Sequence, residues 1–205
     1  MSDKGMMAFG RFVNTPRMPA LAALEAIHAA RDERDIVITT MTPARDWMTL
    51  PQSPLDVVFV PSAMGHATSL GLGLALAQPE RRVIICNGDG SMLMNLGSLV
   101  SIVGASATNV VVVVFENGVY EVTGAQAVPG FGATDFVGIA RAAGFWSVYS
   151  FTEIGAWQRN AEKILRSTGP VFVHLNVAAV SDVPGPKSPG PARDRARRLR
   201  EALRG

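Results

Sequence analysis

The chain has few of the features that would place it in several protein classes. It has one cysteine among 205 residues, so no internal disulfide can form. No apolar run approaches the roughly 20 residues that cross a bilayer, and the start Met-Ser-Asp-Lys has no apolar signal-peptide core. We therefore expect a cytoplasmic protein that does not enter a membrane.

The sequence also lacks the pattern of a nucleic-acid-binding tail. From Lys187 onward it has seven Lys or Arg residues against Asp194 and Glu201, but no aromatic residue among them. Proteins that bind single strands usually stack bases on aromatic rings, so this tail is more simply solvated or docked on a partner. We expect no nucleic-acid partner.

Length and composition favour a single domain. Hydrophobic residues make up 48% of the chain, enough to fill a core in a domain of this size. The segment Ser181–Ala192 contains four prolines and two glycines, typical of an extended linker. We expect an N-terminal tail over 1–14, one domain over 15–180, and a Pro/Gly linker followed by a basic tail over 181–205, where 193–203 could form a short helix.

Apolar and amphipathic segments alternate along the proposed domain. Short apolar segments predict strands at 36–40, 57–60, 83–86, 110–115, 146–149 and 171–177. Helical patterns lie at 19–31, 66–77, 92–103, 135–143 and 153–166, with Ser91 and Thr152 as expected N-caps. This order predicts an α/β three-layer sandwich with a mostly parallel six-stranded sheet, whose ligands bind beyond the carboxyl ends of the strands.

An acid and an amide follow two successive predicted strands. Asp89 lies in a Gly88-Asp89-Gly90 turn, and Asn117 follows the next apolar strand. If these strands are neighbours, the two side chains face one cleft. Carboxylate and amide oxygens suit Mg²⁺, which fills its other positions with phosphate oxygens and water. A lone Gly-Asp-Gly turn is most often structural, so the spacing to Asn117 matters.

The whole segment resembles the cofactor-binding motif of thiamine diphosphate (ThDP) enzymes, and Asn95 and Gly118 extend the match. The resemblance implies that Asp89 and Asn117 bind Mg²⁺ through their side chains and Val119 through its carbonyl oxygen. It implies further cofactor-binding residues at Thr40, Gly65, Gly88, Gly90, Ser91 and Tyr120. One departure is Glu116, where the family often has a second Asn.

A second motif lies upstream, in Pro61-Ser62-Ala63-Met64-Gly65-His66. In ThDP enzymes a bulky apolar residue here separates the two cofactor rings and bends the cofactor, and Met64 occupies that position. The resemblance assigns the Ser62 carbonyl to the cofactor's 4′-amino group. Taken without the family, Met64 is more simply a core residue beside a helix.

Within ThDP enzymes the chain is most similar to the sulfopyruvate and phosphonopyruvate decarboxylases, through Met-Gly-His, the Gly-Asp-Gly segment, and Glu121, Gly124 and Gln126. The segment from Thr39 to Asp46 is similar as well, except that Met41 and Pro43 stand where the group has Gly and Thr. Sulfonate and phosphonate substrates call for cationic groups, and Arg45 is the one nearby candidate. The resemblance therefore does not identify the 2-oxo acid.

ThDP enzymes also need a glutamate that activates the cofactor, and the family carries it on a separate pyrimidine-binding domain. Glu25 and Glu33 lie in patterns typical of solvated surface, and the chain has no room for a second domain. We therefore expect the glutamate to come from a partner, the pyrimidine-binding (alpha) subunit. The chain would be the diphosphate-binding (beta) subunit of a two-chain 2-oxo acid decarboxylase.

Two residues are candidates for proton transfer. His66 neighbours Met64, but a purely structural hydrogen bond is an equal alternative. Glu121 follows the metal loop, and its alternative is a surface carboxylate. Two other functions remain open: a subunit of a carboligase of the acetolactate synthase type, and a non-catalytic regulatory module with a ThDP fold.

Overall fold

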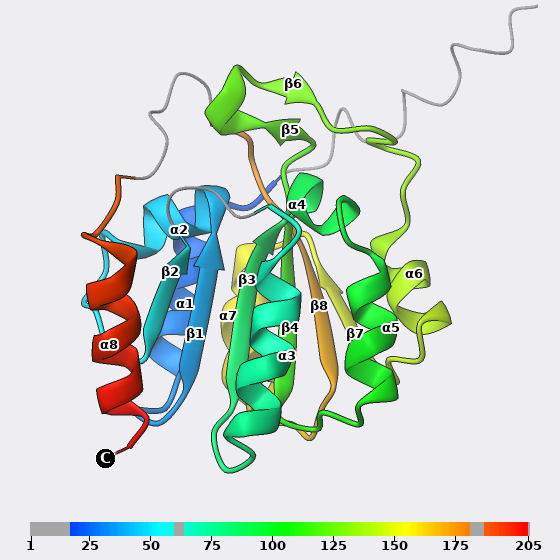
Figure 1. The fold of residues 1–205 in the computed structure, drawn as a ribbon. Helices are drawn as coiled ribbons and strands as arrows, with labels where there is room; N and C mark the ends of the chain where they lie inside the picture. Colours follow the sequence, from blue (N-terminus) through cyan, green and yellow to red (C-terminus); the bar gives the residue numbers. More distant parts are fainter. Residues whose placement is uncertain (1–16, 60–63, 181–186, 205) are drawn as a thin grey trace, which may run out of the picture.

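Six strands form the central sheet, in the order β2-β1-β3-β4-β8-β7 (Figure 1). The structure is a computed structural model and describes residues 17–59, 64–180 and 187–204. Every pairing in this sheet is parallel. The strands are β1 (Ile36–Thr40), β2 (Asp56–Phe59), β3 (Val83–Gly88), β4 (Val110–Glu116), β7 (Ser147–Phe151) and β8 (Val171–Asn176). The expected α/β fold with a six-stranded sheet is confirmed.

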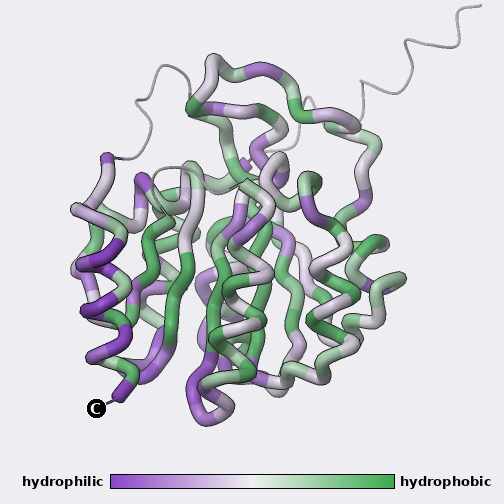
Figure 2. The backbone as a smooth tube through the Cα atoms, viewed as in Figure 1, coloured by the Kyte–Doolittle hydropathy of each residue, from purple (hydrophilic) through white to green (hydrophobic). Residues whose placement is uncertain are grey.

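Helices cover both faces of the sheet and give three layers (Figure 1). One face carries α1 (Ala20–Ala30), α2 (Met41–Trp47) and α7 (Ile154–Leu165). The other carries α3 (Ala67–Ala77), α5 (Gly97–Gly104) and α6 (Phe136–Ala142). In β4, Val111 and Val113 pack toward the first layer, and Val110 and Val112 toward the second. A strand buried on both faces reads as an uninterrupted apolar run, and Figure 2 shows the hydrophobic residues gathered in the strands.

The expected basic helix near the C-terminus forms as α8 (Ala192–Ala202). Its residues Leu199 and Ala202, with Leu203 just beyond it, pack against the apolar cluster beneath α3 and α5. Arg195 donates a hydrogen bond of 2.5 Å to the carbonyl of Val58 in the edge strand β2. The helix therefore covers that edge of the sheet and presents a hydrophilic outer face (Figure 2). Within the part of the chain that the structure describes, no helix is long and apolar enough to span a membrane.

The strand order creates a crevice between β1 and β3. These strands are neighbours, but β1 leads through α2 to β2 on one side, whereas β3 leads to β4 on the other. The helices that follow the two strands also lie on opposite faces of the sheet. Chain segments that diverge in this way leave a space beyond the carboxyl ends of the strands. Thr40 and Gly88, the last residues of β1 and β3, mark its position.

The helix expected over 92–103 is interrupted, which corrects the sequence prediction. The structure has a short α4 (Asp89–Leu93) and a separate α5, with Asn95 in the turn between them. The Asn95 side chain donates to the carbonyl of Gly65, 2.8 Å away, and Asn and Gly97 favour helices less than the residues around them. Ser91 lies inside α4 rather than at its N-cap, which is Gly88.

Three other features differ from the expected pattern. Glu153, not Thr152, is the N-cap of α7. Helix α2 was not predicted, because Thr42 and Pro43 interrupt its apolar pattern. A small hairpin of β5 (Val119–Tyr120) and β6 (Gln126–Ala127), with a 3-10 turn η1 (Glu121–Thr123), lies above the carboxyl ends of the strands in Figure 1. The hairpin was not predicted, because strands of two residues are too short to show an alternating apolar pattern.

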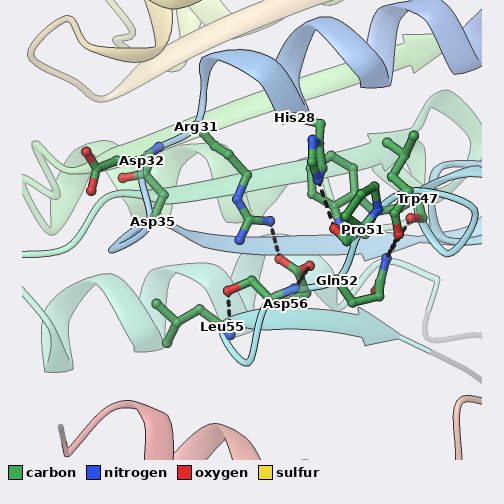
Figure 3. A network of polar contacts seen from close by, with 11 residues as sticks. His28, Arg31, Asp32, Asp35, Trp47, Pro51, Gln52, Leu55 and Asp56 are labelled. Atoms are coloured by element: carbon green, nitrogen blue, oxygen red, sulfur yellow. Dashed lines mark hydrogen bonds and ion pairs between the residues drawn. The ribbon is translucent and has the colours of Figure 1, made fainter.

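A network of polar contacts stabilises the end of the domain opposite the crevice (Figure 3). Arg31, at the end of α1, forms an ion pair of 2.5 Å with Asp56 at the start of β2. Both side chains are almost fully buried, at 8% and 2% exposed, and the Arg31 guanidinium lies over the Trp47 ring. His28 contacts the carbonyl of Pro51 at 2.8 Å. The network joins α1 to the loop between α2 and β2.

Replacing Arg31 by Met should therefore destabilise the domain strongly. The substitution leaves the buried Asp56 carboxylate without its counter-charge, which costs about 3–5 kcal/mol in comparable buried pairs. Arg166→Met is the matched control, because its ion pair with Asp32 is 45% and 40% exposed. Exposed pairs contribute about 0–1 kcal/mol. Urea unfolding of the two variants measures the difference, and equal losses would contradict the assignment.

Candidate active site

A cleft opens at the carboxyl edge of the sheet, at the crevice between β1 and β3. Its walls come from the segments that follow β1, β3 and β4, together with Met64 before α3. It contains about 430 Å³, including open solvent at its mouth. The lining residues are Ala20, Met41, Thr42, Pro43, Met64, Gly88, Asp89, Gly90, Ser91, Phe115, Asn117, Val119, Tyr120, Glu121, Val122 and Val177.

Asp89 lies at the junction of β3 and α4 and is 3% exposed. One carboxylate oxygen accepts a hydrogen bond of 2.8 Å from the Gly90 N–H, and the other accepts one of 2.7 Å from the Gly118 N–H. Burial, with a smaller contribution from the Glu116 carboxylate, raises the pKa of Asp89 to about 6 against the opposing effect of these two bonds. A bound cation would offset the desolvation of this charge.

The loop after β4 meets Asp89 directly, because β3 and β4 are neighbours. The Asn117 amide oxygen accepts a hydrogen bond of 3.0 Å from the Val119 N–H. Gly118 has a φ of 81°, and a Cβ there would lie 2.3 Å from the Phe131 ring. Arg17 donates to the Asn117 carbonyl at 2.9 Å and stacks on Phe131. The loop is therefore held by Asp89 on one side and by Arg17 and Phe131 on the other.

The turn beyond Asp89 has room for glycine only. A Cβ on Gly90 would lie 2.3 Å from the Tyr120 ring, so the Tyr120 side chain approaches the backbone of α4 closely. The Ser91 hydroxyl oxygen accepts a hydrogen bond of 3.0 Å from the Gly65 N–H. This bond ties the segment around Met64 to α4. The turn thus brings Gly90, Ser91 and Tyr120 together, as the sequence predicted.

The segment before α3 is locked in place beside the cleft. Gly65 adopts a φ of 77°, and its carbonyl accepts the bond from Asn95. Met64 is partly buried and lines the cleft. His66 is exposed, its Nδ1 lies 2.8 Å from the Met64 carbonyl, and it is not among the lining residues. This contact is the structural hydrogen bond that the sequence left as an alternative.

Glu121 also lines the cleft, but it is no surface carboxylate. Its side chain is 1% exposed. One oxygen accepts a bond of 2.7 Å from the Thr42 hydroxyl, and the other accepts one of 2.9 Å from the Val180 N–H. Glu121 therefore joins α2, the hairpin and the chain beyond β8. Its role in proton transfer stays a prediction.

Two of the cofactor residues expected from the sequence, Thr40 and Gly65, are not among the residues that line the cleft. Thr40 is fully buried at the end of β1, and its hydroxyl has no hydrogen-bond partner among the described residues. Ser62 lies outside the described residues. Conversely, the sequence did not assign Met41, Thr42, Pro43 and Val122 to the site. The sequence did carry a signal for Met41, because the resemblance led us to expect Gly at this position and the φ of Met41 is 59°.

The donor atoms at the cleft fit a hard cation. The carboxylate of Asp89, the amide oxygen of Asn117 and the carbonyl of Val119 are all oxygens, which Mg²⁺ prefers. The hydrogen bond from Gly118 to Asp89 places the carboxylate against this loop. Cys86 is fully buried, and burial raises the pKa of its thiol, so it behaves as a small apolar residue. The residues present therefore fit an Mg²⁺–diphosphate group.

Fold and cleft together define an α/β protein with a ligand site of oxygen donors at the switch point of a parallel sheet. The family model described as the thiamine pyrophosphate enzyme, C-terminal TPP binding domain, matches residues 35–175. The chain belongs to this family. Thiamine pyrophosphate is the same molecule as ThDP.

Two relatives carry names that bear on function. The chain is 36% identical over 165 residues to the sulfopyruvate decarboxylase subunit beta of Methanothermobacter thermautotrophicus, covering 80% of this chain and 85% of that protein. It is 36% identical over 163 residues to the phosphonopyruvate decarboxylase of Streptomyces viridochromogenes. That match covers 78% of this chain but only 40% of the relative, so the chain spans less than half of that longer enzyme.

A solved structure from Mycobacterium smegmatis shows the same fold. It superposes with a TM-score of 0.68 at 20% sequence identity, covering 80% of this chain and 32% of the other.

Gly90→Ala should destabilise the domain, because its Cβ overlaps the Tyr120 ring. Overpacking of this kind costs about 1–3 kcal/mol. Gly73→Ala is the control: the position is exposed on α3, its Cβ would meet nothing within 4 Å, and alanine there should stabilise by about 0.5–1 kcal/mol. Denaturant unfolding compares the two, and a Gly90→Ala variant as stable as the native chain would contradict the close approach.

Proposed function

We propose that this chain is the diphosphate-binding (beta) subunit of a two-chain, ThDP- and Mg²⁺-dependent 2-oxo acid decarboxylase. The observation that carries the proposal is the buried Asp89 carboxylate, hydrogen-bonded to the loop of Asn117 in a cleft that Met64 also lines. Membership of the ThDP family and similarity to a named beta subunit over 85% of its length support it.

Each group of cleft residues has a proposed role. Asp89, Asn117 and Val119 would bind Mg²⁺ through oxygen atoms, while Gly88, Gly90 and Ser91 would contact the diphosphate. Met64 would support the bent cofactor, with Thr40, Ser62, Gly65 and Tyr120 around it. ThDP, when bound, supplies the electron sink that lets a 2-oxo acid lose CO₂. The protein's part is to hold the cofactor and the substrate in place and to exclude water.

The activating glutamate is proposed to come from a partner, the pyrimidine-binding (alpha) subunit. Among the described residues that line the cleft, the carboxylates are Asp89 and Glu121. Asp89 is assigned to the metal, and both oxygens of Glu121 are engaged by Thr42 and Val180. Neither is available to a cofactor nitrogen. His66 is exposed beside Met64 and does not line the cleft; we keep it as a candidate for proton transfer.

Asp89→Asn tests the metal assignment. The amide can replace only one of the two accepting oxygens, so we expect a loss of about 1–2 kcal/mol in stability without unfolding. Mg²⁺-dependent ThDP binding to the complex with the partner chain should weaken at least 100-fold by calorimetry. The matched control is Asp35→Asn, a second buried carboxyl whose pKa burial raises, at the opposite end of the sheet. Unchanged ThDP binding in Asp89→Asn would refute the site.

The reaction itself is tested with the purified two-chain complex. Release of CO₂ and an aldehyde from a panel of 2-oxo acids would support decarboxylation. Formation of a 2-hydroxy-2-methyl acid from two pyruvates would instead indicate a carboligase. Tight ThDP binding without turnover of any substrate would indicate a regulatory module.

A further inference from the structure

The cleft has the wrong charge for a substrate with a second anionic group. None of the described residues that line it is Lys, Arg or His, whereas Asp89 and Glu121 both carry carboxylates. The positive charge of an Mg²⁺ ion at Asp89 would be neutralised by the cofactor diphosphate. A sulfonate or phosphonate in the same cleft would therefore face Glu121 without a compensating cation among the described residues that line it.

Two arginines that contact residues of the cleft lining, Arg45 and Arg17, already have partners. Arg45 donates to Asp46 at 2.7 Å and lies 3.5 Å from the Glu121 carboxylate. Turning Arg45 into the cleft would remove the counter-charge from Glu121, which is 1% exposed. Arg17 donates to the Asn117 carbonyl and stacks on Phe131. Neither arginine lines the cleft.

The side of the cleft next to Glu121 is apolar instead. Met41 and Pro43 come from the start of α2, and Val122 comes from η1. The hydrogen bond from Thr42 to Glu121 joins these two segments directly. Met41 holds a φ of 59° and is only 9% exposed, a backbone strain of the kind that persists at ligand sites. Its thioether side chain is adaptable in shape and carries no charge.

We propose that Met41, Pro43 and Val122 form a side-chain pocket for a 2-oxo acid with an uncharged aliphatic side chain. The inference rests on the proposed decarboxylase function and specifies its substrate class. It separates this chain from relatives that are named for sulfopyruvate and phosphonopyruvate, both of which carry an anionic side chain.

The first test compares substrates on the complete two-chain enzyme with ThDP and Mg²⁺. We expect kcat/KM for 2-oxobutanoate and 3-methyl-2-oxobutanoate to exceed that for phosphonopyruvate and 3-sulfopyruvate at least tenfold. An equal or higher value for either anionic substrate would overturn the inference and leave the decarboxylase function intact.

A binding measurement separates this inference from the proposed function. The complex is loaded with a deaza analogue of ThDP, which cannot react, and titrated with 3-methyl-2-oxobutanoate or phosphonopyruvate in a calorimeter. Tighter binding of the aliphatic acid supports the pocket even if no turnover is found, in which case only the decarboxylase proposal fails. Tighter binding of phosphonopyruvate overturns the pocket.

Val122→Lys places a cation in the proposed pocket, at a position that is only partly buried. We expect the ratio of kcat/KM for phosphonopyruvate to that for 3-methyl-2-oxobutanoate to rise at least tenfold. Gln158→Lys adds the same charge on the exposed surface of α7 and should leave the ratio unchanged. If both variants shift the ratio equally, the effect is one of net charge and the pocket assignment is wrong.

Met41→Gly tests the pocket without adding charge. Removing the side chain should lower kcat/KM for 3-methyl-2-oxobutanoate relative to pyruvate at least fivefold. Ser106→Gly is the matched control, because Ser106 also has a positive φ, at 53°, but lies in an exposed turn outside the cleft lining. A change of the same size in both variants, or none in Met41→Gly, would contradict the role of the Met41 side chain.

Discussion

The buried carboxylate of Asp89 is the group on which the rest of the cleft depends. It accepts one hydrogen bond from its own turn and one from the loop after the neighbouring strand, so it joins the ends of β3 and β4. Two backbone donors are too little for a buried charge, which is why the pKa of Asp89 rises to about 6. The domain thus maintains a partly compensated anion that a divalent cation would stabilise.

The rest of the site is formed around that carboxylate by aromatic rings that pack closely on the backbone of glycines. The Tyr120 ring occupies the space where Gly90 would carry a side chain, and Phe131 does the same at Gly118. Tyr120 thereby holds the hairpin against the turn after β3, whereas Phe131 packs on Gly118 within the chain that follows β4. The hydrogen bond between Gly65 and Ser91 brings in Met64 from a third segment. The site is therefore formed by three chain segments that contact one another: the segment before α3, the turn after β3 and the chain after β4.

The sequence predicted the sheet and the pairing of Asp89 with the Asn117 loop. Both follow from local pattern: uninterrupted apolar runs mark strands buried on both faces, and parallel strands end at the same edge. The interrupted helix after Asp89 was not predictable in this way, because Asn95 leaves the helical pattern to bond Gly65, thirty residues away along the chain. Helix α2 was missed for two reasons: Thr42 and Pro43 interrupt its apolar pattern, and its left-handed start at Met41 has no local signature in a non-glycine residue.

The sequence by itself determined the fold class, the family, and the positions of Asp89 and Asn117 after β3 and β4, because these depend on residue type and on spacing along one or two elements. The tertiary structure alone decided which side chains reach the cleft. Glu121 is a buried anchor and not a surface acid, and Arg45 is held in an ion pair outside the lining. Both results depend on α2, η1 and the chain beyond β8 meeting in space, which residue spacing does not encode. The proposed preference for an uncharged substrate therefore rests on packing, whereas the proposed cofactor site rests on the motif.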